Sequence, residues 1–141
     1  MGKNSYFLSL QDVVKSYGSS LILKGLNANI EKGELVTFIG PSGCGKSTLL
    51  RCIAGFAKLE SGKIILDGEL INDKPPHKRG TGMVFQNYAL FPHLSVEKNI
   101  GYGLRFRKYP KEQIKKKVEE LLKLVYLQGL GSRRIDQLSG G

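Results

Sequence analysis

The sequence predicts an α/β fold on three observations. Short apolar stretches rich in β-branched residues read as strands, and other stretches have the apolar spacing of helices. A glycine-rich loop leads from one predicted strand directly into one predicted helix. The chain has 141 residues, about the length of one domain, and 40% of them are hydrophobic, which is ordinary for a globular protein.

Strands dominate the first part of the chain. Residues 6–17 are rich in β-forming residues, and residues 22–30 form a second strand-like stretch. Residues 34–40 (ELVTFIG) are short, apolar and β-branched, which is typical of a strand buried in a parallel sheet. Residues 61–71 (SGKIILDGELI) resemble a hairpin, and residues 82–86 (GMVFQ) predict another short buried strand.

Helical spacing occurs in three places. Residues 49–56 follow the glycine-rich loop, and residues 96–104 form a helix that Ser95 can cap, although two glycines weaken it. The third helix covers residues 110–125, with its apolar face formed by Ile114, Val118, Leu121, Leu122 and Val125. Because the sequence changes character after Gln86, we expect a core with a β subdomain in residues 1–86 and a partial helical subdomain in residues 87–141.

The loop itself fits the phosphate-binding pattern G-x-x-x-x-G-K-[ST] in full. Its glycines let successive backbone N–H groups point into one concavity, and the helix that follows directs its positive dipole end to the same place. Lys46 supplies a positive charge for the β- and γ-phosphates, and the Ser47 hydroxyl can bind Mg²⁺. The sequence therefore predicts a nucleotide site in a P-loop NTPase fold, with these binding residues: Gly40, Pro41, Ser42, Gly43, Cys44, Gly45, Lys46, Ser47 and Thr48.

An acidic partner for this loop is missing from the sequence. Most such loops work with a carboxylate at the end of an apolar strand, and the candidate here is Asp67. Gly68 follows it, and the stretch around both residues looks like a hairpin turn, so we interpret Asp67 as a turn residue. No other apolar run ends in an acid.

Four features follow one another in order: an aromatic residue in VVKSYG, the loop GPSGCGKST, then VFQ, and finally LSGG. Their order resembles the ATP-binding subunits of ABC transporters, and the resemblance covers the chain from its first strand to Gly141. It implies a core with an antiparallel β subdomain and a partial helical subdomain. LSGG resembles the start of that family's signature, so the resemblance implies that the chain ends inside a motif and that the C-terminal half of the core is missing.

The resemblance also implies roles for particular residues. Tyr17 would stack on adenine, unless it only packs at a strand end. Gln86 would sense Mg²⁺ and the γ-phosphate, and would be catalytic together with Lys46, unless it is a polar strand terminator. The signature would act in trans, capping the γ-phosphate held by a second copy, through Leu138, Ser139, Gly140 and Gly141. The alternative for this last stretch is a disordered Ser/Gly tail.

A function follows from the resemblance as an expectation. The complete protein is expected to bind ATP and Mg²⁺ and to hydrolyse ATP to power solute import, being similar to the branch that carries polyamines, ferric iron or sulfate. Its partners would be a second copy and permease subunits, which would hold it on the inner face of the cell membrane. The 141 residues alone are expected to be poorly folded and inactive. Two alternatives remain: a soluble ABC-type ATPase acting on nucleic acid or ribosomes, and a nucleotide-binding module without catalysis.

Composition and charge bear on the choice of partner. The net charge of +10 suits nucleic acid, an anionic membrane surface or phosphate-bearing ligands. The lysines at 115–117 lie mostly off the apolar helix face, so we interpret them as solvated and expect no nucleic-acid partner. The apolar stretch 88–92 suits a docking surface for a membrane subunit, or else packs on the helix at 110–125. The sequence shows no signal peptide and no apolar run long enough to span a membrane.

Overall fold

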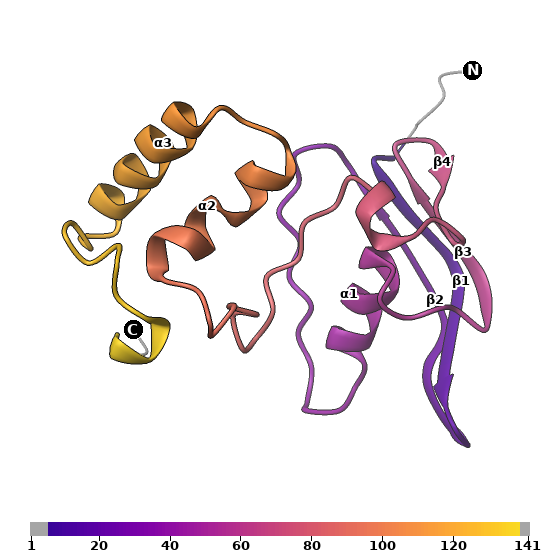
Figure 1. The fold of residues 1–141 in the computed structure, drawn as a ribbon. Helices are drawn as coiled ribbons and strands as arrows, with labels where there is room; N and C mark the ends of the chain where they lie inside the picture. Colours follow the sequence, from indigo (N-terminus) through magenta and orange to yellow (C-terminus); the bar gives the residue numbers. More distant parts are fainter. Residues whose placement is uncertain (1–5, 139–141) are drawn as a thin grey trace. The chain divides into compact units, whose positions relative to one another are not determined.

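The computed structural model describes residues 6–138 (Figure 1). The chain forms two compact units, which divide between Met83 and Val84. None of the helices in the described part of the chain is long and apolar enough to cross a membrane.

The first unit is built on a four-stranded antiparallel sheet with the order β2-β1-β3-β4. Strand β1 covers Leu8–Tyr17, β2 covers Ser20–Ile30, β3 covers Ser61–Leu66 and β4 covers Glu69–Leu70. The two N-terminal strands and the hairpin predicted from the sequence are therefore confirmed. Asp67 lies between β3 and β4 with a φ of 49°, as the interpretation of this residue as part of a turn requires.

Helix α1, Lys46–Ala54, packs against this sheet (Figure 1). Leu49 and Cys52 of the helix join the buried core, which the sheet and the segment after it complete with Leu10, Val13, Leu23, Ile64 and Ile71. Gly55 ends the helix with a φ of 87°, and its N–H donates to the carbonyls of the last turn. The 3₁₀ helix η1, Pro76–Lys78, follows the sheet.

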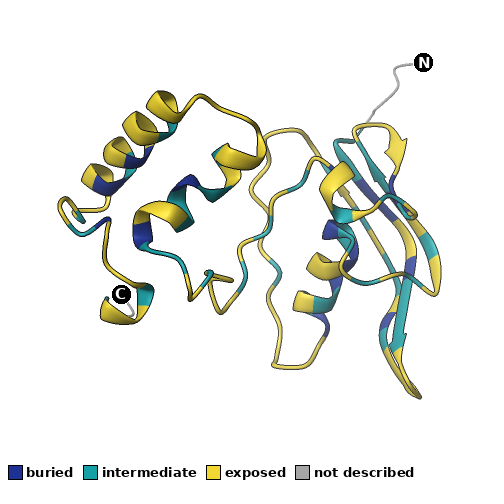
Figure 2. Ribbon diagram, viewed as in Figure 1, coloured by how far each residue is buried: buried dark blue, intermediate teal, exposed yellow. Residues whose placement is uncertain are grey.

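Two predicted strands do not form. Residues 34–40 and 82–86 are irregular, and Leu35, Ile39 and Val84 are 93%, 92% and 91% exposed. Figure 2 shows both segments as largely exposed. A parallel strand needs neighbours to pair its backbone groups and cover its side chains. Among the described residues no strand pairs with either segment, so the prediction of buried strands is wrong for this structure.

The second unit contains a pair of helices. Helix α2 covers Val96–Phe106, α3 covers Lys111–Leu124, and the 3₁₀ helix η2 covers Ile135–Gln137. The Ser95 hydroxyl accepts a hydrogen bond from the Lys98 N–H at 3.4 Å, which confirms the predicted cap. The buried core of the unit is formed by Val96, Val118 and Leu122.

The apolar face predicted for α3 is confirmed only in part, since Leu121 is partly buried and is not among the described residues that pack on the core of this unit. Val118 and Leu122 are buried and Ile114 packs on them, but Val125 lies just past the helix and is 54% exposed. The packing of α2 on α3 explains why one of the two glycines in α2, Gly101, is present. A Cβ at this position would lie 3.1 Å from Ile114 Cγ2, so the missing side chain lets α2 and α3 approach closely.

Candidate functional site

The glycine-rich loop enters α1 through a left-handed turn. Gly43 and Gly45 have φ values of 82° and 103°, a region that residues with a side chain rarely adopt. Gly45 is buried, and a Cβ there would lie 3.0 Å from both Ile22 Cγ2 and Leu23 Cδ2 of β2. The loop therefore needs glycine at this position both for its backbone conformation and for the close passage of β2.

The side chain of Lys46 folds back across the loop. Its Nζ donates to the carbonyls of Gly40 at 2.7 Å and Pro41 at 2.8 Å, and lies 3.5 Å from Cys44 Sγ. These contacts join the two ends of the loop through one cation. The positive charge is thus held at the loop by the protein's own carbonyls.

The start of α1 is suited to an anion. The first N–H groups of a helix have no partner within the helix, and the dipole is positive at this end. No side chain caps the start of α1, and its first turn holds no acidic residue. The hydroxyl-bearing residues Ser47 and Thr48 lie in this first turn, directly after Lys46. Loop and helix together form a concentrated positive potential that can bind phosphate oxygens.

A hollow of about 540 Å³ lies beside the loop. Gly43 and Cys44 form one side of it, and β2 forms the other with Leu21, Ile22, Leu23, Lys24 and Leu26. Nothing in the sequence predicts this apolar wall. The alternation of residues along β2 predicts a strand but not which loop it faces, because the contact joins segments about 20 residues apart in the sequence.

Tyr17 lies next to that wall. It ends β1 and pairs with Ser20, while its neighbour Ser16 pairs with Leu21, so the backbone of Tyr17 is one step along the ladder from a residue that lines the hollow. The side chain is half-exposed, and Lys15 Nζ lies 5.1 Å from its ring centroid. Glu60 holds Lys15 in place with an ion pair of 2.7 Å, and this hydrogen bond raises the pKa of Lys15. The residue is thus exposed enough to stack on a ligand.

The other predicted site residues lie outside the first unit. Gln86 belongs to the second unit, where it is exposed in a turn instead of ending a buried strand, so that part of the prediction is wrong. Leu138 follows η2 and packs on the core of α2 and α3. The predicted signature residues Ser139, Gly140 and Gly141 lie outside the described residues.

Comparison with known proteins decides the family. The sequence profile of the ABC transporter family matches residues 23–141, which include the loop, Gln86 and the LSGG stretch. The chain belongs to this family. The resemblance inferred from the order of the motifs is confirmed.

Curated relatives of this ABC protein include import subunits. It is 50% identical over 134 residues to the spermidine/putrescine import ATP-binding protein PotA of Clostridium novyi, covering 95% of this chain and 39% of that protein. It is 47% identical over 135 residues to the Fe(3+) ions import ATP-binding protein FbpC of Vibrio cholerae, covering 96% of this chain and 38% of that protein. The chain thus spans about two fifths of the length of these relatives.

Solved structures confirm the fold class of this ABC protein. The ATP-binding cassette MJ0796, a dimer bound to ADP and Pi, matches with a TM-score of 0.80 and 35% identity, over 94% of this chain and 63% of that one. The protein cbiO1 from Clostridium perfringens matches with a TM-score of 0.77 and 33% identity, over 95% and 56% of the two chains. The P-loop ATPase fold with an antiparallel β subdomain is therefore correct.

The apolar stretch 88–92 is partly exposed and partly anchored on α2. Tyr88 and Leu90 are 68% and 46% exposed. The ring of Phe91 packs instead on Tyr102, with 4.2 Å between the ring centroids. The alternative that this stretch packs on the protein itself therefore applies to Phe91. The helix it packs on is α2, however, and not α3 as predicted.

The side chain of Asn99 holds this stretch. Its Oδ1 accepts from the Phe91 N–H at 2.9 Å, and its Nδ2 donates to the carbonyls of Phe91, Leu94 and Ser95 at 3.1, 3.2 and 3.0 Å. Asn99 lies in the first turn of α2, and the backbone groups that it binds all precede the helix. One amide thus fixes the path of the backbone ahead of the helix.

We expect Asn99→Ala to loosen the stretch and to lower the free energy of unfolding by about 1–3 kcal/mol, because partly buried backbone groups lose their partner. Hydrogen exchange of the Phe91 amide should accelerate, whereas exchange in α3 should change little. Lys98→Ala, an exposed neighbour, is the control. Unchanged exchange at Phe91 in the Asn99 variant would show that the amide does not hold the stretch.

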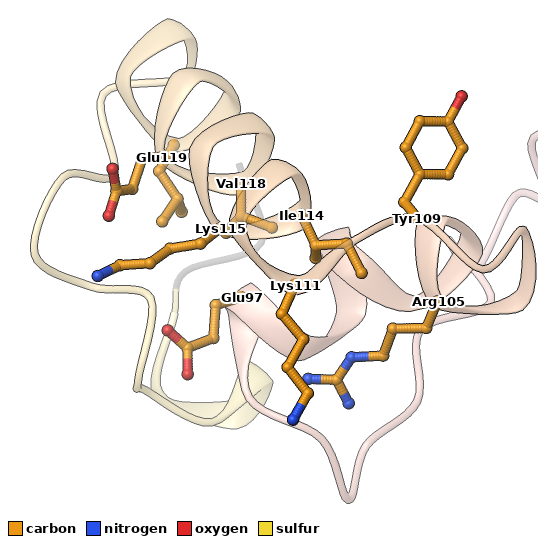
Figure 3. A pocket seen from close by; sticks show the side chains of 9 residues that line it. Glu97, Arg105, Tyr109, Lys111, Ile114, Lys115, Val118 and Glu119 are labelled. Carbon is orange, nitrogen blue, oxygen red and sulfur yellow. The ribbon is translucent and has the colours of Figure 1, made fainter.

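A second hollow, of about 780 Å³, lies between α2 and α3 (Figure 3). Ile114, Val118 and Leu122 form its apolar part. Its charged lining residues carry both signs, namely Arg105, Lys111, Lys115, Glu97 and Glu119. Figure 3 shows that Arg105 and Lys111 extend in the same direction while Tyr109 points away from them. The lining of this hollow has no glycine turn and includes the carboxylates of Glu97 and Glu119, which repel phosphates, so the loop before α1 is the better candidate for a nucleotide.

Proposed function

We propose that the whole protein binds ATP and hydrolyses it to power the import of a solute. The observation that carries this proposal is the loop at the start of α1, with its left-handed glycines, its uncapped helix and the Lys46 ammonium on the Gly40 and Pro41 carbonyls. Membership of the ABC transporter family supports the same activity. Because the chain spans about two fifths of its relatives, the activity is a proposal for the whole protein.

In this proposal the phosphates lie on the loop, and its binding residues are Gly40, Pro41, Ser42, Gly43, Cys44, Gly45, Lys46, Ser47 and Thr48. The helix dipole is directed at the loop before the nucleotide arrives. The Lys46 ammonium already lies at the loop and would exchange the Gly40 and Pro41 carbonyls for phosphate oxygens. The adenine base stacks on Tyr17, beside the apolar wall of β2. Gly43 has open space above it, since a Cβ there would meet nothing within 4 Å, so the concavity is free to receive a ligand.

Magnesium fits this site as a partner of the nucleotide. Mg²⁺ is usually bound by one or two protein groups together with substrate phosphates. The exposed Ser47 hydroxyl in the first turn of α1 would be one ligand. The role of Gln86 toward the metal, which the family resemblance implies, stays a prediction. Bound Mg²⁺ would neutralise charge on the phosphate oxygens. Within the described residues no cluster of three His, Cys, Asp or Glu side chains could hold a metal ion by itself, which agrees with a shared site.

The proposed partners follow from the relatives. The cassette MJ0796 is a dimer, and cbiO1 is described as part of the transporter complex cbiONQ. We infer a second copy of this chain, whose Leu138, Ser139, Gly140 and Gly141 cap the γ-phosphate in trans, and permease subunits that hold the protein on the inner face of the cell membrane. Tyr88 and Leu90 offer an exposed apolar surface for such a permease. The two relatives are named for polyamines and ferric ions, which makes cationic solutes the first to test.

The proposal is tested by phosphate release from the purified whole protein with ATP and Mg²⁺, and by uptake of radiolabelled spermidine or ferric ion in cells that lack the gene. ATP hydrolysis that depends on Mg²⁺ is the expected result. Absence of both ATP binding and hydrolysis would overturn the proposal. Tight, salt-sensitive binding to duplex DNA would favour a soluble ATPase that acts on nucleic acid.

Replacing Tyr17 by alanine is expected to weaken ATP and GTP binding alike, by roughly 5- to 150-fold, since stacking on a base contributes about 1–3 kcal/mol and tolerates base identity. Tyr17→Phe should retain most of the affinity, and Tyr126→Ala, at a side chain that is 89% exposed, is the matched control. Equilibrium binding of both nucleotides measures the effect. A loss confined to ATP would indicate a hydrogen-bonding contact to adenine instead of stacking.

A further inference from the structure

Arg79 is a buried cation that directly follows the 3₁₀ helix η1. It is 6% exposed, and burial lowers the pKa of its guanidinium, whose ordinary value is high enough to keep it charged at neutral pH. The guanidinium donates to four backbone carbonyls: Lys74 at 2.7 Å, Cys52 at 2.8 Å, Asn72 at 2.9 Å and Ile53 at 3.0 Å. One side chain therefore joins two segments that are about 20 residues apart in the sequence.

Two of these carbonyls belong to the end of α1. Cys52 and Ile53 lie in its last turn, where carbonyls have no partner within the helix and the dipole is negative. A cation at this place is favourable for both reasons. Gly55 makes room for it, because a Cβ there would lie 2.6 Å from Arg79 Nε. The end of α1 is thus shaped around the guanidinium.

The other two carbonyls connect the helix to the sheet. Asn72, whose carbonyl Arg79 holds, donates its own side-chain amide to the Gly62 carbonyl at 2.9 Å. Its Oδ1 accepts from the Ile64 N–H of β3 at 2.8 Å. Through Arg79 and Asn72 the C-terminus of α1 is therefore fixed to β3 by hydrogen bonds.

We propose that Arg79 is a positioning residue for the nucleotide loop, an inference that rests on the proposed function. The loop and Arg79 hold opposite ends of one helix of nine residues, roughly 14 Å long. Arg79 does not contact the loop; it sets where the helix that carries Lys46 and Ser47 lies on the sheet. A misplacement of about 1 Å can reduce a reaction rate on the order of 100-fold. Loss of the Arg79 hydrogen bonds would therefore lower the rate of ATP hydrolysis by shifting the helix that carries Lys46 and Ser47.

The test compares Arg79→Met and Arg79→Lys with the wild type in the whole protein. The kcat/KM for ATP is measured at a temperature at which circular dichroism shows every variant to be folded. Arg79→Met should lower kcat/KM by about tenfold or more. Arg79→Lys should lower it less, because an ammonium keeps the charge but cannot reach all four carbonyls. Leu66→Ala, at the end of β3, removes a partly buried side chain that packs on the same core but binds none of the Arg79 carbonyls. It should lower the Tm and leave kcat/KM within about twofold.

A double-mutant cycle separates positioning from general destabilisation. Gly55→Ala alone should lower kcat/KM because its methyl group displaces the guanidinium. In the Arg79→Ala background only the backbone strain of its φ of 87° remains, so the further loss of kcat/KM should be small. Additive losses would overturn the inference, as would a kcat/KM for Arg79→Met equal to that of Leu66→Ala. If Arg79→Met does not fold, the double-mutant cycle and the kcat/KM of Arg79→Lys still test whether Arg79 positions the loop. A wild-type protein that does not turn over ATP would overturn the proposed function instead.

Discussion

Replacing Lys46 by alanine is expected to lower ATP turnover in the whole protein by about 100-fold or more, and to weaken ATP binding as well. Preorganised charge directed at a transferred phosphate contributes on this order. In the structure the ammonium also joins the Gly40 and Pro41 carbonyls, so its removal leaves the loop less ordered before the nucleotide binds. Both effects lower turnover, and the second also raises the Kd.

The measurement is steady-state phosphate release together with equilibrium binding of ATP. Lys63→Ala removes an exposed lysine from β3, away from the loop, and should behave as the wild type. Turnover of the Lys46 variant within about tenfold of the wild type would mean that the loop does not stabilise the phosphates electrostatically.

Local chemistry explains which features could be predicted from the sequence. The glycines and lysine of the loop, the cap at Ser95 and the turn at Asp67 each depend on residues a few positions apart, and the structure contains all of these features. Roles that depend on a bound nucleotide, such as those of Tyr17 and Gln86, stay predictions. A sequence pattern of about ten residues identifies a helix, strand or loop, but not the segments that pack against it from elsewhere in the sequence.

Partners that are distant in the sequence could not be predicted. Residues 34–40 have the composition of a buried strand, but a strand forms only where another chain segment pairs with it, and none of the described residues does so. No motif or spacing in the sequence singles out Arg79 or Asn99. Their importance comes from the backbone carbonyls they reach, and for Arg79 those of α1 lie 26 and 27 residues away. No local pattern contains that information.

Replacing Gly62 by alanine is expected to destabilise the sheet by more than about 4 kcal/mol, a size reached by few single substitutions. Gly62 has a φ of 93°, which alone is unfavourable for alanine. Strand β1 bulges opposite it, between Gln11 and Val14. A Cβ at Gly62 would lie 2.6 Å from the Gln11 carbonyl oxygen and 2.6 Å from the Asp12 carbonyl carbon, and would also meet the Asp12 oxygen. These atoms belong to the backbone and cannot rotate away, so β1 and β3 must separate.

The consequence extends to the nucleotide site because α1 packs on this part of the sheet through Leu49 and Cys52. Thermal unfolding followed by circular dichroism should show a Tm lowered by on the order of 10 °C, with a matching loss of soluble protein. Gly68→Ala is the control, since Gly68 also has a positive φ, of 79°, but has no atom within 4 Å of a built Cβ. It carries the backbone strain without the clash and should cost about 1–2 kcal/mol. Equal losses in the two variants would show that strain alone, and not the contact with β1, reserves this position for glycine.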